Sequence, residues 1–164
     1  MNTVNPASQP KWGQSQHDMG GVVEALGWGL VAGLVGTMAQ TVSQLIEQRF
    51  THREDSTVTV QVGAMLLRPP LKTGEQASRL GLAVHWGHGI VMGAVRGLLG
   101  LTALGTVAAS VLHYLVVWGG NVMLYVALGI APMPWKWGGT ALATDLFHKL
   151  VLSAVTSVVF VALY

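Results

Sequence analysis

Residues 80–101 read LGLAVHWGHGIVMGAVRGLLGL. This apolar stretch is long enough to cross the hydrocarbon core of a bilayer, which takes about 20 residues of α-helix. It nevertheless contains His85, His88 and Arg96, and such groups are costly inside a membrane unless they have a role. Three other apolar stretches also contain polar or ionisable residues. The sequence therefore predicts an all-α membrane protein, a bundle of four transmembrane helices over about residues 20–47, 79–101, 105–128 and 140–163.

The composition agrees with a chain that lies mostly in lipid. Of its 164 residues, 51% are hydrophobic and only 10% are charged, and the mean hydropathy is +0.51. Soluble domains carry about 25% charged residues. The net charge of +2 is too small to indicate nucleic-acid binding. The chain has no cysteine, no H-E-x-x-H motif and no phosphate-binding glycine loop, so we expect no enzymatic activity.

Two polar segments flank the first predicted span. Residues 1–19 are expected to form a flexible tail. Residues 49–78 form a charged first loop. Within it, apolar side chains recur at helical spacing over residues 58–66, after a candidate N-cap at Ser56. We expect a short interfacial helix there, ended by Arg68-Pro69-Pro70, rather than a lone strand. A signal peptide cleaved near Ala39 is a weaker alternative for the first span.

The placement of Lys and Arg predicts the orientation. The positive-inside rule puts the basic loops in the cytoplasm and both termini outside. The residues of the first and third loops that decide this are Arg49, Arg53, Arg68, Lys72, Arg79 and Lys136.

Helices that run alternately up and down would sort the polar residues into two layers. The layer near the basic loops would contain Gln40, Gln44, His85, His88, Asn121, Asp145 and His148. The second layer would contain Glu24, Arg96 and His113. In the second layer, an Arg96 that reaches the membrane surface is favoured over a buried Glu24–Arg96 pair. Lys149 is expected to pair with Asp145 one turn away.

Three roles are open for the layer near the basic loops. It can be a hydrogen-bond network that fixes the register of the helices, a proton or ion relay, or a set of side chains that bind a metal ion or haem. The pairs His85-x-x-His88 and Asp145-x-x-His148 would be the metal ligands, and paired histidines can also hold haem. We expect no cofactor, with haem or a divalent metal as the alternative.

Glycines recur every fourth residue in two spans. Gly29-x-x-x-Gly33 lies in the first, and Gly89-x-x-x-Gly93-x-x-x-Gly97 lies in the second. Small residues at this spacing let helices approach closely in lipid. Packing within one bundle is favoured, and homo-oligomerisation or a partner in a membrane complex is the alternative.

From about Leu80 to the C-terminus the chain resembles the YagU-like group of small bacterial inner-membrane proteins. The motifs that carry the resemblance are His85-x-x-His88-Gly89, Gly119-Gly120-Asn121, Leu128-Gly-Ile-Ala-Pro-Met-Pro134 and Asp145-x-x-His148. The group is largely uncharacterised, and one member is linked to acid resistance. The resemblance implies an integral protein of the bacterial inner membrane. We therefore expect a role in proton or pH homeostasis, with a haem- or metal-binding redox subunit or an assembly subunit as alternatives.

Overall fold

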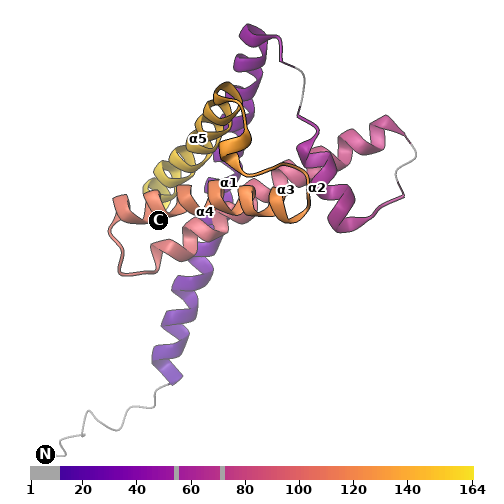
Figure 1. The fold of residues 1–164 in the computed structure, drawn as a ribbon. Helices are drawn as coiled ribbons and strands as arrows, with labels where there is room; N and C mark the ends of the chain where they lie inside the picture. The colour runs from indigo at the N-terminus through magenta and orange to yellow at the C-terminus, as the bar shows by residue number, and fades with distance from the viewer. Residues whose placement is uncertain (1–11, 54–55, 71–72) are drawn as a thin grey trace, which may run out of the picture.

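The structure is a computed structural model that describes residues 12–53, 56–70 and 73–164. Within these residues all regular elements are helices, which confirms the predicted all-α class (Figure 1). The elements are α1 (Trp12–Thr51), α2 (Val58–Leu67), α3 (Gly74–Gly100), α4 (Thr106–Ala127), the short 3-10 helix η2 (Pro134–Lys136) and α5 (Gly139–Leu163).

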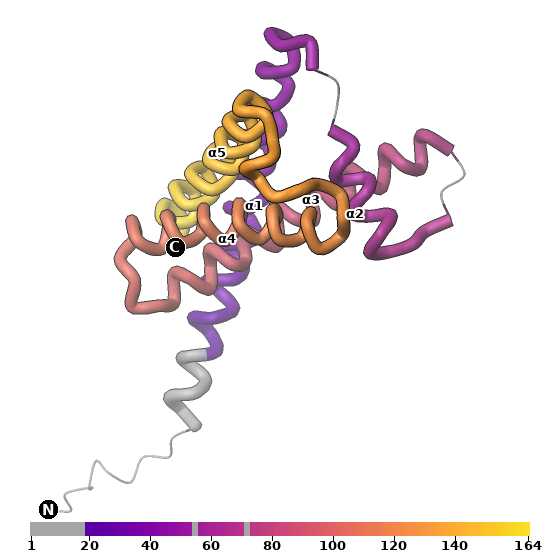
Figure 2. Tube along the Cα trace, viewed as in Figure 1, coloured from indigo at the N-terminus to yellow at the C-terminus, as the bar shows by residue number. Residues whose placement is uncertain are grey.

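The four long helices alternate in direction. Ala25 near the start of α1 lies at Gly97 near the end of α3, whereas Thr41 lies at His85 near the middle of α3. α1 packs most extensively on α3 and α5, and α4 packs on both α3 and α5. The trace shows α3 and α4 side by side, crossing the pair formed by α1 and α5 (Figure 2). The N-terminal end of α1 extends beyond the other helices (Figure 1).

Three of the helices are long and apolar enough to cross a membrane. They are the Met19–Thr51 part of α1, α4 and α5. Three of the four predicted spans are thus helices of membrane-spanning length and composition. α3 falls outside this set because His85, His88 and Arg96 lower the mean hydropathy of its apolar stretch.

Large apolar side chains lie mainly on the outside of the bundle. Val23, Val107 and Val158 are each at least two-thirds exposed, at 70%, 77% and 69%. The buried positions are mostly small or polar, among them Ala32 and Thr37. A surface of this kind is unfavourable in water and suits contact with lipid.

The closest helix contact is the crossing of α1 over α3. A Cβ added at Gly33 would lie 2.5 Å from the carbonyl oxygen of Gly89 and 2.7 Å from the Cα of Gly93. A Cβ added at Gly29 would lie 2.5 Å from the carbonyl oxygen of Gly93. The two backbones therefore touch where both helices carry glycine, so the glycine repeats serve packing within this chain.

Both boundaries of α1 and the start of α3 differ from the predicted ones by four residues or more. α1 begins at Trp12, inside the segment expected to be a flexible tail, because a helix extends readily from an existing span. Residues 1–11 of that segment lie outside the described residues. α2 forms as predicted, but its Val62 and Gly63 are buried against α3. Its N-cap position is Thr57, whose side chain makes no capping hydrogen bond, whereas Ser56 Oγ accepts a hydrogen bond from Val58 N at 3.4 Å. The helix ends at Leu67, and the C-cap residue Arg68 has a φ of 45°.

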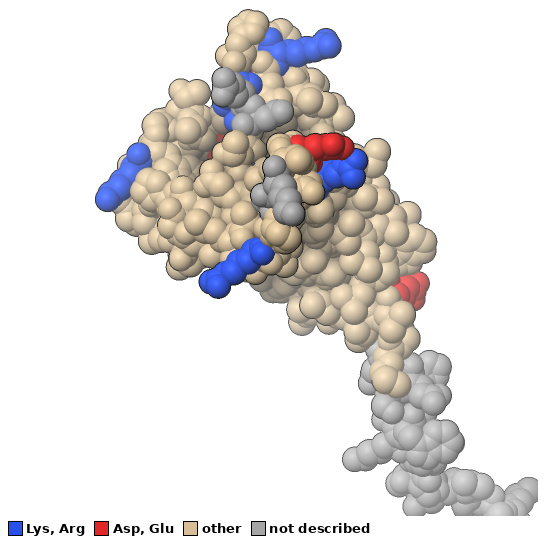
Figure 3. Space-filling model, turned by 90° about the vertical axis from the view of Figure 1, so that its right-hand side faces the viewer, with Lys and Arg blue, Asp and Glu red and all other residues tan. Residues whose placement is uncertain are grey.

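The charged side chains are unevenly distributed. On the face seen in Figure 3, Lys and Arg lie toward the end remote from the N-terminus. The exposed basic residues of this end include Arg49 and Arg53 at the end of α1, Arg68 after α2, and Arg79 in α3. A large cavity opens at this end, with Arg53 in its lining.

Candidate functional site: a polar vestibule

A cavity of about 1030 Å³ lies between the C-terminal half of α1, the start of α2, the first half of α3 and the start of α5. We call it the vestibule. The polar and ionisable side chains that line it include Gln40, Gln44, Glu47, Arg53, His85, Asp145, His148 and Lys149. Two hydrogen bonds tie α1 to α3 and to α5 at the vestibule wall.

The first of these bonds joins α1 to α5. Ser43 Oγ donates to the carbonyl oxygen of Gln40 at 2.7 Å and lies 2.8 Å from His148 Nδ1. A hydroxyl has one proton, so it must accept the hydrogen bond from His148. The bonding therefore assigns the proton of the neutral His148 ring to Nδ1 and leaves a lone pair on Nε2.

His148 Nε2 faces a carboxylate. It is buried and has no hydrogen-bond partner among the described residues, and Glu47 Oε2 lies 3.7 Å away. The same carboxylate receives Arg53 Nη2 at 2.8 Å. A proton added at Nε2 would therefore create an imidazolium beside an anionic group that is already present.

The second bond joins α1 to α3. Thr41 Oγ1 donates to the carbonyl oxygen of Thr37 at 2.8 Å and lies 3.0 Å from His85 Nε2. By the same reasoning, His85 donates from Nε2 and keeps its lone pair on Nδ1. Both vestibule histidines thus use one nitrogen for structure and have the other nitrogen available for a proton.

Further polar side chains continue from the vestibule into the bundle. His88 lies near His85, Asn121 and His113. His113 is fully buried, and its Nε2 lies 3.0 Å from the carbonyl oxygen of Met92. The three histidines of α3 and α4 therefore form a row from the vestibule toward the opposite end of the bundle.

The predicted layer near the basic loops is brought together only in part. Gln40, Gln44, His85, Asp145 and His148 line the vestibule. His88 and Asn121 lie together deeper in the bundle.

The predicted pairing of Asp145 with Lys149 is not a direct ion pair, although the two charges attract each other. Asp145 accepts a hydrogen bond from Trp118 Nε1 at 3.0 Å. Among the described residues, no ion pair within 4.0 Å joins its carboxylate to Lys149. Trp118 of α4, rather than Lys149 one turn along α5, makes the close polar contact with the Asp145 carboxylate.

The predicted second layer is dispersed. Glu24 is exposed on α1, whereas Arg96 and His113 are buried, Arg96 with only 1% of its surface exposed. Arg96 is buried rather than exposed as expected, and among the described residues it forms no ion pair with Glu24. Its Nε donates to Ser157 Oγ at 3.1 Å, and its guanidinium lies 4.7 Å from the centre of the Phe160 ring. The Arg96 guanidinium therefore contacts the Ser157 hydroxyl and the Phe160 ring in place of the expected water or acid.

The four candidate metal ligands do not converge. His85 bonds Thr41, His148 bonds Ser43, and Asp145 bonds Trp118. Across the described ranges, no group of three His, Cys, Asp or Glu side chains is placed to hold one metal ion. The geometry does not fit a divalent metal at these residues.

Several residues of the vestibule have no distinctive signal in the sequence. Thr41 and Ser43 orient the histidines, but Ser and Thr are common inside membrane helices. Glu47 was within the predicted first span, and its acidic side chain near a span end was the one clue available. Comparisons with family models, with curated proteins and with solved structures found no match for this chain.

Proposed function

We propose that the chain is a multi-pass membrane protein in which α3 forms a fourth span. The polar residues of α3 lower its mean hydropathy, but Arg96 is buried and His85 and His88 are partly buried. The exposed side chains of α3 include Leu82, Val91 and Leu98. Lipid would therefore meet an apolar surface on α3 as well.

Within this architecture we propose that the vestibule takes up protons from water and passes them to the histidine row. The observation that carries the proposal is the unpartnered Nε2 of His148, which faces Glu47 3.7 Å away. Protons would bind there, next to an anion that stabilises the imidazolium. Water that entered the vestibule would connect His148 to His85, which both line it, and His88 and His113 continue inward. This reading supports the predicted role in proton or pH homeostasis.

The test is proton flux across liposomes that contain the purified protein and an internal pH-sensitive dye. The intact protein should dissipate an imposed pH gradient faster than protein-free liposomes. His148→Gln removes the proton-binding nitrogen and keeps a polar side chain, so the rate should fall at least tenfold. Glu47→Gln should lower the rate less, because His148 can still be protonated.

The matched control is His52→Gln. His52 is an exposed histidine at the end of α1, outside the vestibule lining. This variant should conduct protons at the rate of the intact protein. A His148→Gln variant that conducts equally well, or an intact protein that conducts no better than empty liposomes, excludes the proton-relay role.

A further inference from the structure

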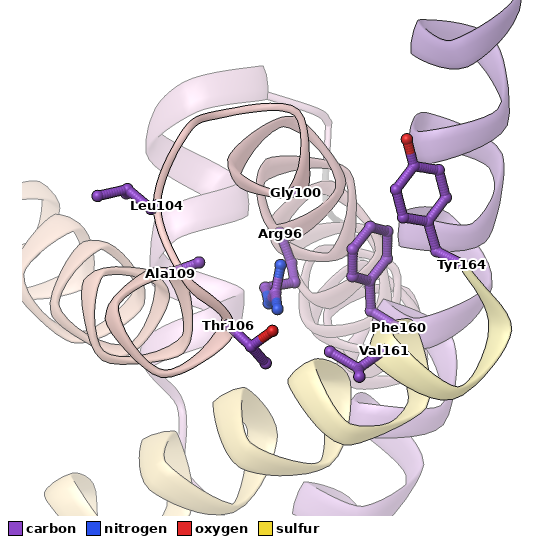
Figure 4. A pocket seen from close by; sticks show the side chains of 8 residues that line it. All are labelled: Arg96, Gly100, Leu104, Thr106, Ala109, Phe160, Val161 and Tyr164. Carbon is purple, nitrogen blue, oxygen red and sulfur yellow. The ribbon is translucent and has the colours of Figure 1, made fainter.

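A second, smaller cavity lies at the opposite end of the bundle, at the turn between α3 and α4. It encloses about 170 Å³. Figure 4 shows Arg96 of α3 beside it, together with residues of the first turn of α4 and of the last turns of α5. The lining residues used below are Arg96, Thr106, Ala109, Phe160, Val161 and Tyr164.

Arg96 brings to this cavity a guanidinium whose Nη1 is unsatisfied. Its Nη1 is buried and has no hydrogen-bond partner in the described part of the chain. None of the ion pairs within 4.0 Å among these residues includes it. The nearest other titratable group on α4 is His113, which is a base and not an acid. A buried guanidinium without a counter-anion is strongly unfavourable, so an anion from outside the chain would stabilise it.

The start of α4 supplies further donors to the same cavity. The N-cap residue of α4 is Gly105, and no side chain caps this helix end. The first-turn amide N–H groups of a helix have no intrahelical acceptor, and the helix dipole is positive there. Thr106 and Ala109 of this end line the cavity, and the hydroxyl of Thr106 adds another donor. Figure 4 shows the Arg96 guanidinium directed toward Thr106.

We propose that this cavity binds a phosphate group, held by Arg96 Nη1 and by the N-terminal amides of α4. A planar guanidinium matches the oxygens of a phosphate, and helix N-termini are recurrent phosphate sites. The cavity lies at a helix turn, which is the level of lipid headgroups if α3 and α4 span the bilayer. The phosphate therefore comes either from a phospholipid headgroup or from free inorganic phosphate.

The experiment has two arms that distinguish these sources. In the first, the protein is purified in mild detergent, and bound phospholipid is counted by native mass spectrometry. In the second, delipidated protein is titrated with inorganic phosphate in a calorimeter. Retention of about one phospholipid per chain identifies the lipid source, and saturable binding in the second arm identifies free phosphate. An intact, folded protein that binds neither overturns the proposal.

The variants test the site itself. Arg96→Gln should weaken binding about tenfold or more, because it removes a charge-assisted hydrogen bond. Val161→Phe should have a similar effect with Arg96 intact. Val161 is half exposed at the cavity, so a larger side chain blocks the space without repacking the core.

Arg49→Gln is the matched control, since Arg49 is exposed and at the other end of the molecule. It should bind like the intact protein. Should Arg96→Gln fail to fold, Val161→Phe decides alone. Binding that survives in Val161→Phe, or in a folded Arg96→Gln, places the phosphate elsewhere and overturns the proposed site.

Discussion

The two halves of α1 meet their neighbours in opposite ways. The part of α1 before Gln40, called its first half below, turns Ala25, Gly29, Gly33 and Thr37 inward, and its backbone touches that of α3. The second half turns Gln40, Thr41, Ser43 and Glu47 toward α3 and α5, and a cavity of about 1030 Å³ lies beside it. One continuous helix therefore touches the backbone of α3 without space for water at one level, and it borders the vestibule at another. The difference follows from side-chain size, because glycine lets helices touch and longer polar side chains hold them apart.

The sharpest contrast between the two halves should be water access. The chain has no native cysteine, so a single introduced thiol can be labelled selectively. Gln44→Cys lies in the vestibule and should react with a membrane-impermeant thiol reagent in liposomes. Thr37→Cys, two turns earlier on α1 and fully buried, should stay unreacted over the same time. Equal labelling of the two thiols would contradict the proposed wet and dry halves.

The largest loss of stability should come from the dry half. Gly33→Leu places a side chain where a Cβ already lies 2.5 Å from a backbone oxygen of α3. Backbone cannot move aside as a side chain can, so we expect destabilisation by about 3 kcal/mol or loss of folding. Thermal unfolding in detergent, followed by circular dichroism, measures it.

Gly27→Ala is the control for this prediction. Gly27 lies on the same helix with nothing within 4 Å of an added Cβ. The variant should be as stable as the intact protein or more stable by about 1 kcal/mol, because alanine favours the helix. If the two variants behaved alike, the α1–α3 contact would not depend on glycine.

A smaller effect is expected for Ser43→Ala in the polar half. It removes the acceptor of the His148 Nδ1 hydrogen bond, which is 2.8 Å long. Without this bond, the ring proton is no longer held on Nδ1. We expect a loss of about 1 kcal/mol. Thermal unfolding of Ser43→Ala beside Ser78→Ala, whose serine is exposed on α3, checks the value. An unchanged unfolding temperature would show that the bond does not stabilise the α1–α5 contact.

The smallest effect should come from the edge of the vestibule. Glu47→Gln removes the ion pair with Arg53, whose side chain is 40% exposed. Exposed pairs contribute little, so we expect about 0.5 kcal/mol in thermal unfolding at low salt, and less at high salt. A loss as large as that of Gly33→Leu would mean that Glu47 is a structural residue of the core.

The sequence predicted the helices well because their signals are local. The end of α3 and both ends of α4 and α5 lie within one residue of those expected from apolar runs bounded by glycine, proline or charge, whereas α3 begins five residues earlier, at Gly74. The alternation of helix direction then placed Gln44, His85, Asp145 and His148 at one end of the bundle. These four residues do line one cavity.

The partners of the polar residues could not be predicted in the same way. Arg96 was expected at the surface or with an acid, but a serine and a phenylalanine contact it. Trp118 was not considered as the partner of Asp145, because an indole in a membrane helix usually indicates only apolar packing. Partner choice depends on rotation and crossing of the helices, which the apolar pattern leaves undetermined.

The length of α1 has a mechanical consequence. Its 40 residues span about 60 Å, whereas the hydrocarbon core is about 30 Å thick. In a bilayer, α1 must therefore tilt strongly or extend into the water as a rigid helix. Ser43 and Glu47 belong to the same helix. Anything that pulls on the protruding end would thus turn the wall of the vestibule directly, with no flexible linker to absorb the motion.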